Sequence, residues 1–398
     1  MMKIAAVLVL LLATCCQAQD AATLAAREAN QHAFELFQLF RQMTKGNFCF
    51  SPYSGHRVAA MLAEGAKGET QKQLIAMAHL SADASSRASQ AEELRQELSK
   101  TTGQSLVLEV ANSIWIPSGK AFLPSFVTLA KEQFGASSLP LPPGDAVSAA
   151  AVVNRWIREK TRGRIPSLVG PGVFDANLPT ALVVNAVYLK GNWSQPFEIS
   201  KTKPREFTHA SASTSMLPMM LQTAAFEYSD SEAWQCLEMP FSGDDFCMRF
   251  LLPRAEAGRT VLETALSSAT WDKVVQASNN CDVNVMLPRF GFSTQLDLKG
   301  LWQTLGASDA FEVQKADFTA MTSHQPCWTS GVIHEATIEV NEQGAEAAAA
   351  TVAADPFGAA PEAPKRRRVS FIANHPFLWV IQHRRTGLIL FMGRFAGE

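Results

Sequence analysis

Residues 340–351 read Val340-Asn341-Glu342-Gln343-Gly344-Ala345-Glu346-Ala347-Ala348-Ala349-Ala350-Thr351. From Val332 to Val340, apolar side chains alternate with mostly polar ones, a pattern that predicts a half-buried strand. With a period of two, the next residues present one face of small, uncharged side chains: Ala345, Ala347, Ala349, Thr351 and Ala353. Such a segment can lie in solvent as a loop, and it can also fit between two strands without a steric clash.

The same alanines are strong helix formers, and composition alone favours a short helix here. The neighbouring sequence favours another interpretation. Gly344 interrupts the strand pattern, and Asp355-Pro356-Phe357-Gly358 predicts a break soon after the alanines. A strand, a hinge and an alanine-rich segment together indicate a loop that can become a strand.

The chain has 398 residues, of which 47% are hydrophobic, enough for a large core in one domain or two. Its formal net charge of -2 gives no field that would attract nucleic acid. Residues 1–18 combine Lys3, an apolar run from Ile4 to Ala13, and the small-residue end Cys16-Gln17-Ala18. This pattern predicts a secretory signal peptide. Since the apolar run is too short to span a bilayer, we expect a secreted, extracellular protein without a membrane anchor.

Five cysteines remain after the expected signal: Cys49, Cys236, Cys247, Cys281 and Cys327. An odd, sparse set in so long a chain does not indicate a disulfide scaffold. Cys236 and Cys247 flank a predicted hairpin turn, so a bond between them is one alternative. Buried free thiols are the interpretation that the sequence favours.

The predicted elements mix helices and strands without regular alternation. Helices are expected at 22–43, from 52, and at 124–134, 146–161, 259–277 and 296–305. Strands are expected at 106–116, 181–190, 283–292, 369–373, 377–383 and 388–395, with a strand-rich region at 216–252. The mixture predicts an α+β fold with large, mostly antiparallel sheets.

Catalytic motifs are absent from the sequence. It contains no nucleophile elbow, zinc-protease motif, C-x-x-C pair or phosphate-binding loop, and its eight histidines lack metal-ligand spacing. His334 could act as a general base, but a single histidine on a strand is more often a hydrogen-bonded core residue. We therefore expect that the protein is not an enzyme and that it binds neither a cofactor nor a metal. If it acts on proteases, it acts as their substrate.

Several blocks, in the same order, resemble the serpin family over nearly the whole mature chain. They are Asn47–Pro52; Asn154, Trp156, Thr161, Gly163 and Ile165; Val184–Trp193, with Leu189 where phenylalanine is usual; Asp317–Met321; Asn374–Leu378; and Leu390–Arg394. The resemblance implies one domain over residues 19–398, with three β-sheets, about nine helices and an exposed reactive-centre loop at about 342–368. It also implies a monomeric inhibitor of serine proteases. The protease attacks the loop and forms an acyl-enzyme, and the cleaved loop then inserts into the main sheet.

The resemblance assigns roles to individual residues. The hinge of the loop is Glu342, Gln343, Gly344, Ala345, Glu346, Ala347, Ala348, Ala349, Ala350 and Thr351, with Ala345 where inhibitory members more often have threonine or serine. A sheet-opening cluster comprises Ser51, Ser54, Asn185 and His334. Trp193 lies where the loop would first enter the sheet, and Arg289 would pair with Glu342. For each of these residues, simple core packing is the alternative role.

Counting along the loop as in the family places the scissile bond between Gly358 and Ala359, which suits an elastase-like protease. A shift of one residue would present Phe357 to a chymotrypsin-like enzyme. The rival site is Lys365, Arg366, Arg367 and Arg368, which would attract trypsin-like or furin-like proteases; the same residues could instead begin an edge strand.

The remaining predictions concern partners and modification. A glycosaminoglycan could bind Lys365–Arg368 by charge, whereas residues 82–100 lack a basic stripe. Asn192 begins the one glycosylation sequon, and burial of the neighbouring Trp193 would argue against its use. The alternative function is that of a non-inhibitory serpin: a carrier, a hormone precursor or a chaperone.

Overall fold

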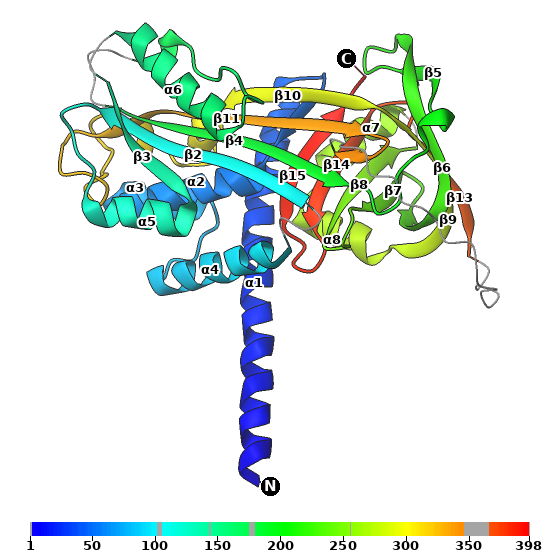
Figure 1. Ribbon diagram of the computed structural model, residues 1–398, viewed down its shortest axis with the longest axis horizontal. Helices are drawn as coiled ribbons and strands as arrows, with labels where there is room; N and C mark the ends of the chain where they lie inside the picture. Colours follow the sequence, from blue (N-terminus) through cyan, green and yellow to red (C-terminus); the bar gives the residue numbers. More distant parts are fainter. Residues whose placement is uncertain are drawn as a thin grey trace.

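The computed structural model describes residues 2–101, 106–142, 145–174, 180–254, 256–345 and 366–397. Within them the chain forms nine α-helices and two hydrogen-bonded sheets, which confirms the expected α+β architecture (Figure 1). The helices are α1 Met2–Met43, α2 Pro52–Gly65, α3 Gly68–Met77, α4 Ala84–Thr101, α5 Pro124–Phe134, α6 Ala146–Lys160, α7 Glu256–Ala265, α8 Ser268–Gln276 and α9 Lys299–Thr304. Short 3-10 turns lie at Pro171–Val173, Ile199–Lys201 and Asp309–Phe311.

The main sheet has the order β10-β11-β12-β4-β2-β3. Its strands are β10 Phe290–Asp297, β11 Trp328–Asn341, β12 Gly344–Ala345, β4 Thr180–Asn192, β2 Leu106–Pro117 and β3 Ala136–Leu141. β4 pairs with β11 in parallel, while β2 and β10 are antiparallel to their central neighbours. In Figure 1, α6 lies on one side of this sheet and α2, α3 and α5 lie on the other.

The second sheet has the order β1-β15-β14-β8-β7-β6-β9-β13, with β5 paired to β6. Its strands are β1 Phe48–Phe50, β5 Lys203–Thr208, β6 Thr214–Asp230, β7 Trp234–Pro240, β8 Phe246–Pro253, β9 Asn279–Pro288, β13 Arg368–Ile372, β14 Phe377–His383 and β15 Ile389–Phe395. β6 has 17 residues and pairs with β5, β7 and β9 along its length. The resemblance implied three sheets. Hydrogen bonding through β6 joins the strands outside the main sheet into one continuous second sheet, so two sheets are formed.

Alternating residues of β4 face different layers of the core. Val187 and Leu189 pack in an apolar cluster with the second sheet, whereas Val184 and Ala186 pack with α6. We call the face toward the second sheet the inner face and the face toward α6 the outer face. The alternation fixes the direction of every later side chain on β4.

Two predicted elements are each divided into two in the structure, and the helix expected at 296–305 begins later, at Lys299, because Leu296 and Asp297 belong to β10. The single strand expected at 283–292 is two strands in different sheets, β9 and β10, separated by Arg289. The Arg289 N–H donates to the Pro218 carbonyl (2.9 Å), so the chain leaves one sheet there and enters the other. The helix expected at 259–277 is divided into α7 and α8, because Ser267 caps the start of α8 with its side chain.

The expected free thiols are confirmed, and the bond between Cys236 and Cys247 is not formed. The five cysteines after residue 18 all lie in the described part of the chain and are buried and free. Cys236 lies opposite Leu251 and Cys247 lies opposite Pro240, so the two thiols are not cross-strand neighbours. Burial raises the pKa of each to about 12, which keeps them protonated and unreactive.

Candidate functional site

The hinge lies where β11 turns back into β12 between the two central strands. Ala345 pairs with Val340 of β11 and with Gly191 of β4, and its side chain is fully buried. Gly344 has a φ of 151°, and a Cβ added there would overlap the Gly191 carbonyl oxygen. Only glycine fits this position. The first two residues of the alanine-rich segment therefore already form a short third strand between β11 and β4.

Glu342 fixes the turn through an ion pair that the sequence predicted. Its carboxylate pairs with Arg289 and accepts a hydrogen bond from Thr202 Oγ1 at 2.7 Å. Burial tends to raise the pKa of Glu342, but the hydrogen bonds from Arg289 and Thr202 outweigh it and lower that pKa. The carboxylate is deeply buried, with 4% of the residue exposed, whereas the Arg289 side chain is 46% exposed.

The segment that follows β4 also holds the hinge. Trp193 donates its backbone N–H to the Gln343 carbonyl (2.8 Å) and its indole N–H to the Asn341 carbonyl (3.0 Å). The Phe197 N–H donates to the Glu342 carbonyl (2.8 Å). Trp193 is buried and stacks on Phe241 with ring centroids 4.9 Å apart. These contacts place Trp193 against the hinge turn.

A second group of polar residues lies below the hinge, on the inner face where α2 begins. His334 Nε2 accepts the Ser51 backbone N–H at 3.1 Å, so Nδ1 carries the proton and donates to Asn185 Oδ1 at 2.5 Å. Ser51 Oγ donates to the Leu390 carbonyl (2.7 Å) and accepts the Ser54 N–H at 3.3 Å. These contacts connect α2, β4, β11 and β15 through one side-chain network.

Asn112 completes this network and was not predicted from the sequence. Asn185 Nδ2 donates to Ser54 Oγ (2.5 Å) and to Asn112 Oδ1 of β2. Asn112 is 4% exposed. The available signal was an asparagine inside a predicted strand, where asparagine is disfavoured unless it has a specific polar partner.

His334 is a neutral histidine in this network. Its residue is 1% exposed, and burial lowers the pKa of His334 to about 3. No acidic side chain faces its ring nitrogens, since their partners are Ser51 and Asn185. The arrangement therefore suits a structural contact across β4 and β11, because both ring nitrogens are engaged in hydrogen bonds and a pKa of about 3 makes the imidazole a weak base.

The predicted scissile residues Phe357, Gly358 and Ala359, the hinge residues 346–351 and Lys365 lie outside the described residues. The rest of the basic run is anchored. Arg367 makes two hydrogen bonds of 3.1 Å to the Asp230 carboxylate, and Arg366 pairs with Asp282 at 3.7 Å. Arg368 is the first residue of β13, and its backbone lies opposite Asp282 of the parallel strand β9.

Asn192, the sequon residue, is exposed at the end of β4, opposite Gly344. Burial of Trp193 therefore does not bury the asparagine that precedes it. On α4, each basic residue is paired with a glutamate: Arg87 with Glu64, Arg95 with Glu92 and Lys100 with Glu97. This helix presents no stripe of unpaired positive charge.

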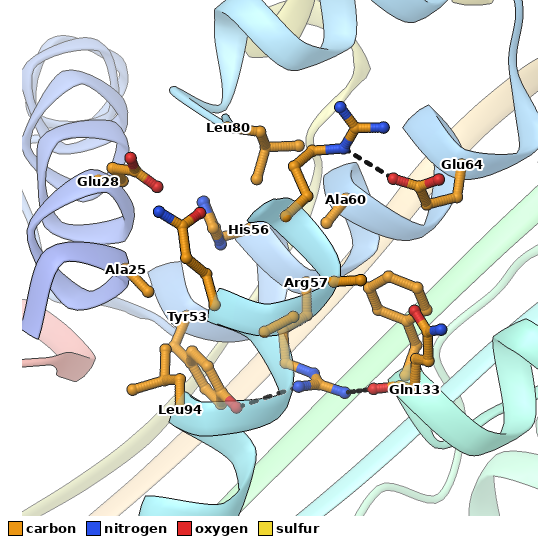
Figure 2. A pocket seen from close by; sticks show the side chains of 15 residues that line it. Ala25, Glu28, Tyr53, His56, Arg57, Ala60, Glu64, Leu80, Leu94 and Gln133 are labelled. Carbon is orange, nitrogen blue, oxygen red and sulfur yellow. Dashed lines mark hydrogen bonds and ion pairs between the residues drawn. The ribbon is translucent and has the colours of Figure 1, made fainter. Parts of the chain in front are cut away.

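An apolar cavity lies between α1, α2, α4 and α5 (Figure 2). Arg57 crosses it, donating to the Tyr53 hydroxyl (3.4 Å) and the Gln133 carbonyl (2.5 Å). The cavity holds about 60 Å³, whereas sites for small ligands typically occupy about 300–1,000 Å³. Among the described residues, no three metal-ligating side chains form a group that could hold an ion. No described helix is long and apolar enough to cross a membrane.

We predict that the His334 network loses stability in acid. The pKa is about 3 in the fold and 6.5 when unperturbed, so the unfolded chain binds a proton below pH 6.5 that the folded chain excludes. The stabilisation of the fold by neutral His334 is complete above pH 6.5 and declines as the pH falls toward 3. At pH 5 the difference of about 1.5 pKa units corresponds to about 2 kcal/mol.

The measurement is urea unfolding at pH 7.5 and pH 5 for the natural chain, for His334→Gln and for the control His324→Gln, whose histidine is exposed. Between pH 7.5 and pH 5, the free energy of unfolding should fall by about 2 kcal/mol more in the natural chain and in the control than in His334→Gln. Equal losses in all three proteins would contradict the assignment.

Comparison with known proteins identifies the family. A family model described as Serpin (serine protease inhibitor) matches residues 27–397. Leukocyte elastase inhibitor of Homo sapiens is 33% identical over 374 residues, which covers 92% of this chain and 97% of the relative. Neuroserpin of Rattus norvegicus is 34% identical over 360 residues, covering 87% and 85%.

The fold gives the same result. The crystal structure of native protease nexin-1 with heparin matches with a TM-score of 0.83 and 26% identity, over 95% of this chain and 99% of that chain. The chain belongs to the serpin family.

Proposed function

We propose that this protein is a secreted inhibitor of serine proteases that acts as a suicide substrate. The observation that carries the proposal is β12, which occupies the position of an additional strand between β11 and β4. The hydrogen-bonded hinge fixes the direction and register in which the loop would continue. An inhibitory loop must follow this path after cleavage.

The register of β12 shows where the following residues would go. Continued along β4 and β11, it would place Ala347 between Leu189 and Ile338, and Ala349 between Val187 and Ala336. These neighbours are at most 1% exposed and belong to the inner apolar cluster. Small, uncharged side chains can enter such a space without the free-energy penalty of burying charge or excess volume.

Further along the same register, Thr351 would arrive between Asn185 and His334. These two residues are hydrogen-bonded to each other across β4 and β11. Insertion would therefore have to break this contact, and a threonine hydroxyl can both donate and accept a hydrogen bond in its place. The network then acts as a barrier that the loop passes after cleavage.

The chemistry belongs to the target protease. Its serine hydroxyl would attack the carbonyl of the residue before the scissile bond, expel the amine of the next residue and leave the loop as an ester. Water would hydrolyse that ester in an ordinary substrate. Rapid insertion of the loop would move the attached protease before deacylation occurs, so the outcome depends on the relative rates of these two steps.

We place the scissile bond between Gly358 and Ala359, with an elastase-like target and Phe357 as the chymotrypsin-like alternative. The similar leukocyte elastase inhibitor supports this class. The anchoring of Arg366 and Arg367 to acidic residues of the second sheet disfavours the basic run, since a protease needs an extended, accessible segment.

Secretion is proposed from residues 1–18, and a target protease is the proposed partner. A glycosaminoglycan is a weaker candidate, because the protease nexin-1 structure contains heparin but α4 here has paired charges. The cavity beneath α4, at about 60 Å³, is too small to hold a ligand of ordinary size.

The test is incubation of the mature protein with elastase, chymotrypsin, trypsin and furin, followed by denaturing electrophoresis and mass spectrometry of the released peptide. We predict an SDS-stable complex with the elastase-like enzyme and a released peptide that starts at Ala359. A start at Gly358 would assign Phe357, and a start between Arg366 and Val369 would assign the basic run. Cleavage by every enzyme without a complex would contradict inhibition.

Changing Ala349 to arginine should convert the inhibitor into a substrate. An unpaired guanidinium on the inner face beside Val187 would cost several kcal/mol to bury, so insertion would become slower than deacylation. We expect cleavage of Ala349→Arg without a stable complex, while the control Ala349→Gly keeps the small volume and forms one. Equal complex formation by the two variants would argue against insertion in this register.

A further inference from the structure

The sequon Asn192-Trp193-Ser194 lies at the end of β4, beside the hinge, and the proposed inhibitory mechanism does not use it as a sequon. An asparagine-linked oligosaccharide is bulky and hydrophilic, so an asparagine that carries one must lie on the surface of the fold. The sequence placed this requirement in doubt, because burial was expected at Trp193. Use of the sequon therefore depends on where its three side chains point.

The backbone of the sequon is extended and held by hydrogen bonds. Asn192 pairs with Gly344 of β12, and its carbonyl accepts the Ser242 N–H at 2.8 Å. The Ser194 N–H donates to the Pro240 carbonyl at 3.0 Å. In an extended chain, successive side chains point to opposite sides, and residues two positions apart share a face. Asn192 and Ser194 therefore share one face of this segment.

Trp193 occupies the opposite face, which belongs to the core. It is 2% exposed and stacks on Phe241 in the inner apolar cluster. Asn192 and Ser194 are both exposed, and neither side chain forms a hydrogen bond with a described residue. Burial of the middle residue thus turns the acceptor amide and the hydroxyl of the sequon toward solvent, and it favours glycosylation instead of preventing it.

The hinge leaves space beside Asn192. Its partner Gly344 has no side chain, and a Cβ added there would lie 2.7 Å from the Asn192 Cα. No side chain of the paired residue therefore crowds a substituent on the asparagine. The hydrogen bonds from this segment to Gln343 and Asn341 come from the Trp193 backbone and indole N–H groups. A substituent on Asn192 Nδ2 replaces none of them.

We propose that Asn192 carries an N-linked oligosaccharide on the exposed side of β4, beside the hinge turn. The inference rests on the proposed secretion of the chain. The donor is a lipid-linked oligosaccharide diphosphate, which the transferase of the secretory pathway uses. Asn192 Nδ2 loses one proton and forms a bond to the anomeric carbon, while the bond from that carbon to the phosphate oxygen breaks and the lipid diphosphate leaves with its electron pair. The Ser194 hydroxyl is required for recognition of the acceptor.

The test is expression of the full chain, with residues 1–18, in a eukaryotic secretory cell. Protein from the medium is treated, still folded, with an amidase that removes N-linked oligosaccharides and converts the acceptor asparagine to aspartate. Intact mass and peptide mapping are measured before and after treatment. The variants are Ser194→Ala, which removes the sequon, and Ser194→Thr, which keeps it. The control is Asn374→Gln, at an exposed asparagine outside any sequon.

We expect the natural protein, Ser194→Thr and the control to lose mass on treatment, with the conversion to aspartate mapped to Asn192. Ser194→Ala should be secreted at the mass of the bare chain. Its Tm should match that of the amidase-treated natural protein, because the Ser194 hydroxyl has no described partner. Removal of the oligosaccharide from the folded protein would support its position on the exposed face.

Three results would overturn the inference. Natural protein that reaches the medium at the mass of the bare chain overturns glycosylation alone and leaves secretion supported. An oligosaccharide that persists in Ser194→Ala overturns the assignment to Asn192. A chain that stays inside the cell, with residues 1–18 still attached and no oligosaccharide, overturns both the inference and the proposed secretion.

Discussion

The parallel contact between β4 and β11 is the interaction on which the rest of the structure depends. It closes the centre of the main sheet from Thr180 and Trp328 to Tyr188 and Thr337. Beyond that point the strands are separated by two residues of the hinge. β4 and β11 are thus hydrogen-bonded to each other up to Tyr188 and Thr337, and they are held apart by β12 at Gly191 and Val340. The alanine-rich segment begins in this separated part of the sheet.

The polar residues divide into two groups around this contact. At the top, Glu342, Arg289 and Thr202 hold the hinge turn, and Trp193 binds its carbonyls. Below, His334 and Asn185 bond across the closed part of the sheet. Buried polar contacts of this kind require specific partners, so they favour a single arrangement of the strands. An incoming strand would meet the upper group first and the lower group later.

The sequence predicted the hinge because its signal is local: a strand pattern, a glycine and a run of small side chains. The cluster of Ser51, Ser54, Asn185 and His334 came from the family resemblance, and the structure brings these residues into one hydrogen-bonded network. Thr202 was missed because its partner Glu342 is 140 residues away, and no local pattern links them. The division of 283–292 into two strands was also missed, since the hydrogen bond from Arg289 to Pro218 depends on tertiary pairing.

The central claim is that the cleaved loop becomes a strand between β4 and β11. The most direct measurement is thermal unfolding of the protein before and after a single cleavage in the loop by a protease that forms no complex. Insertion adds hydrogen bonds and buries the small face of the loop, so the account predicts a large increase in Tm for the cleaved protein. An unchanged Tm would show that the loop does not enter the sheet and would contradict the account.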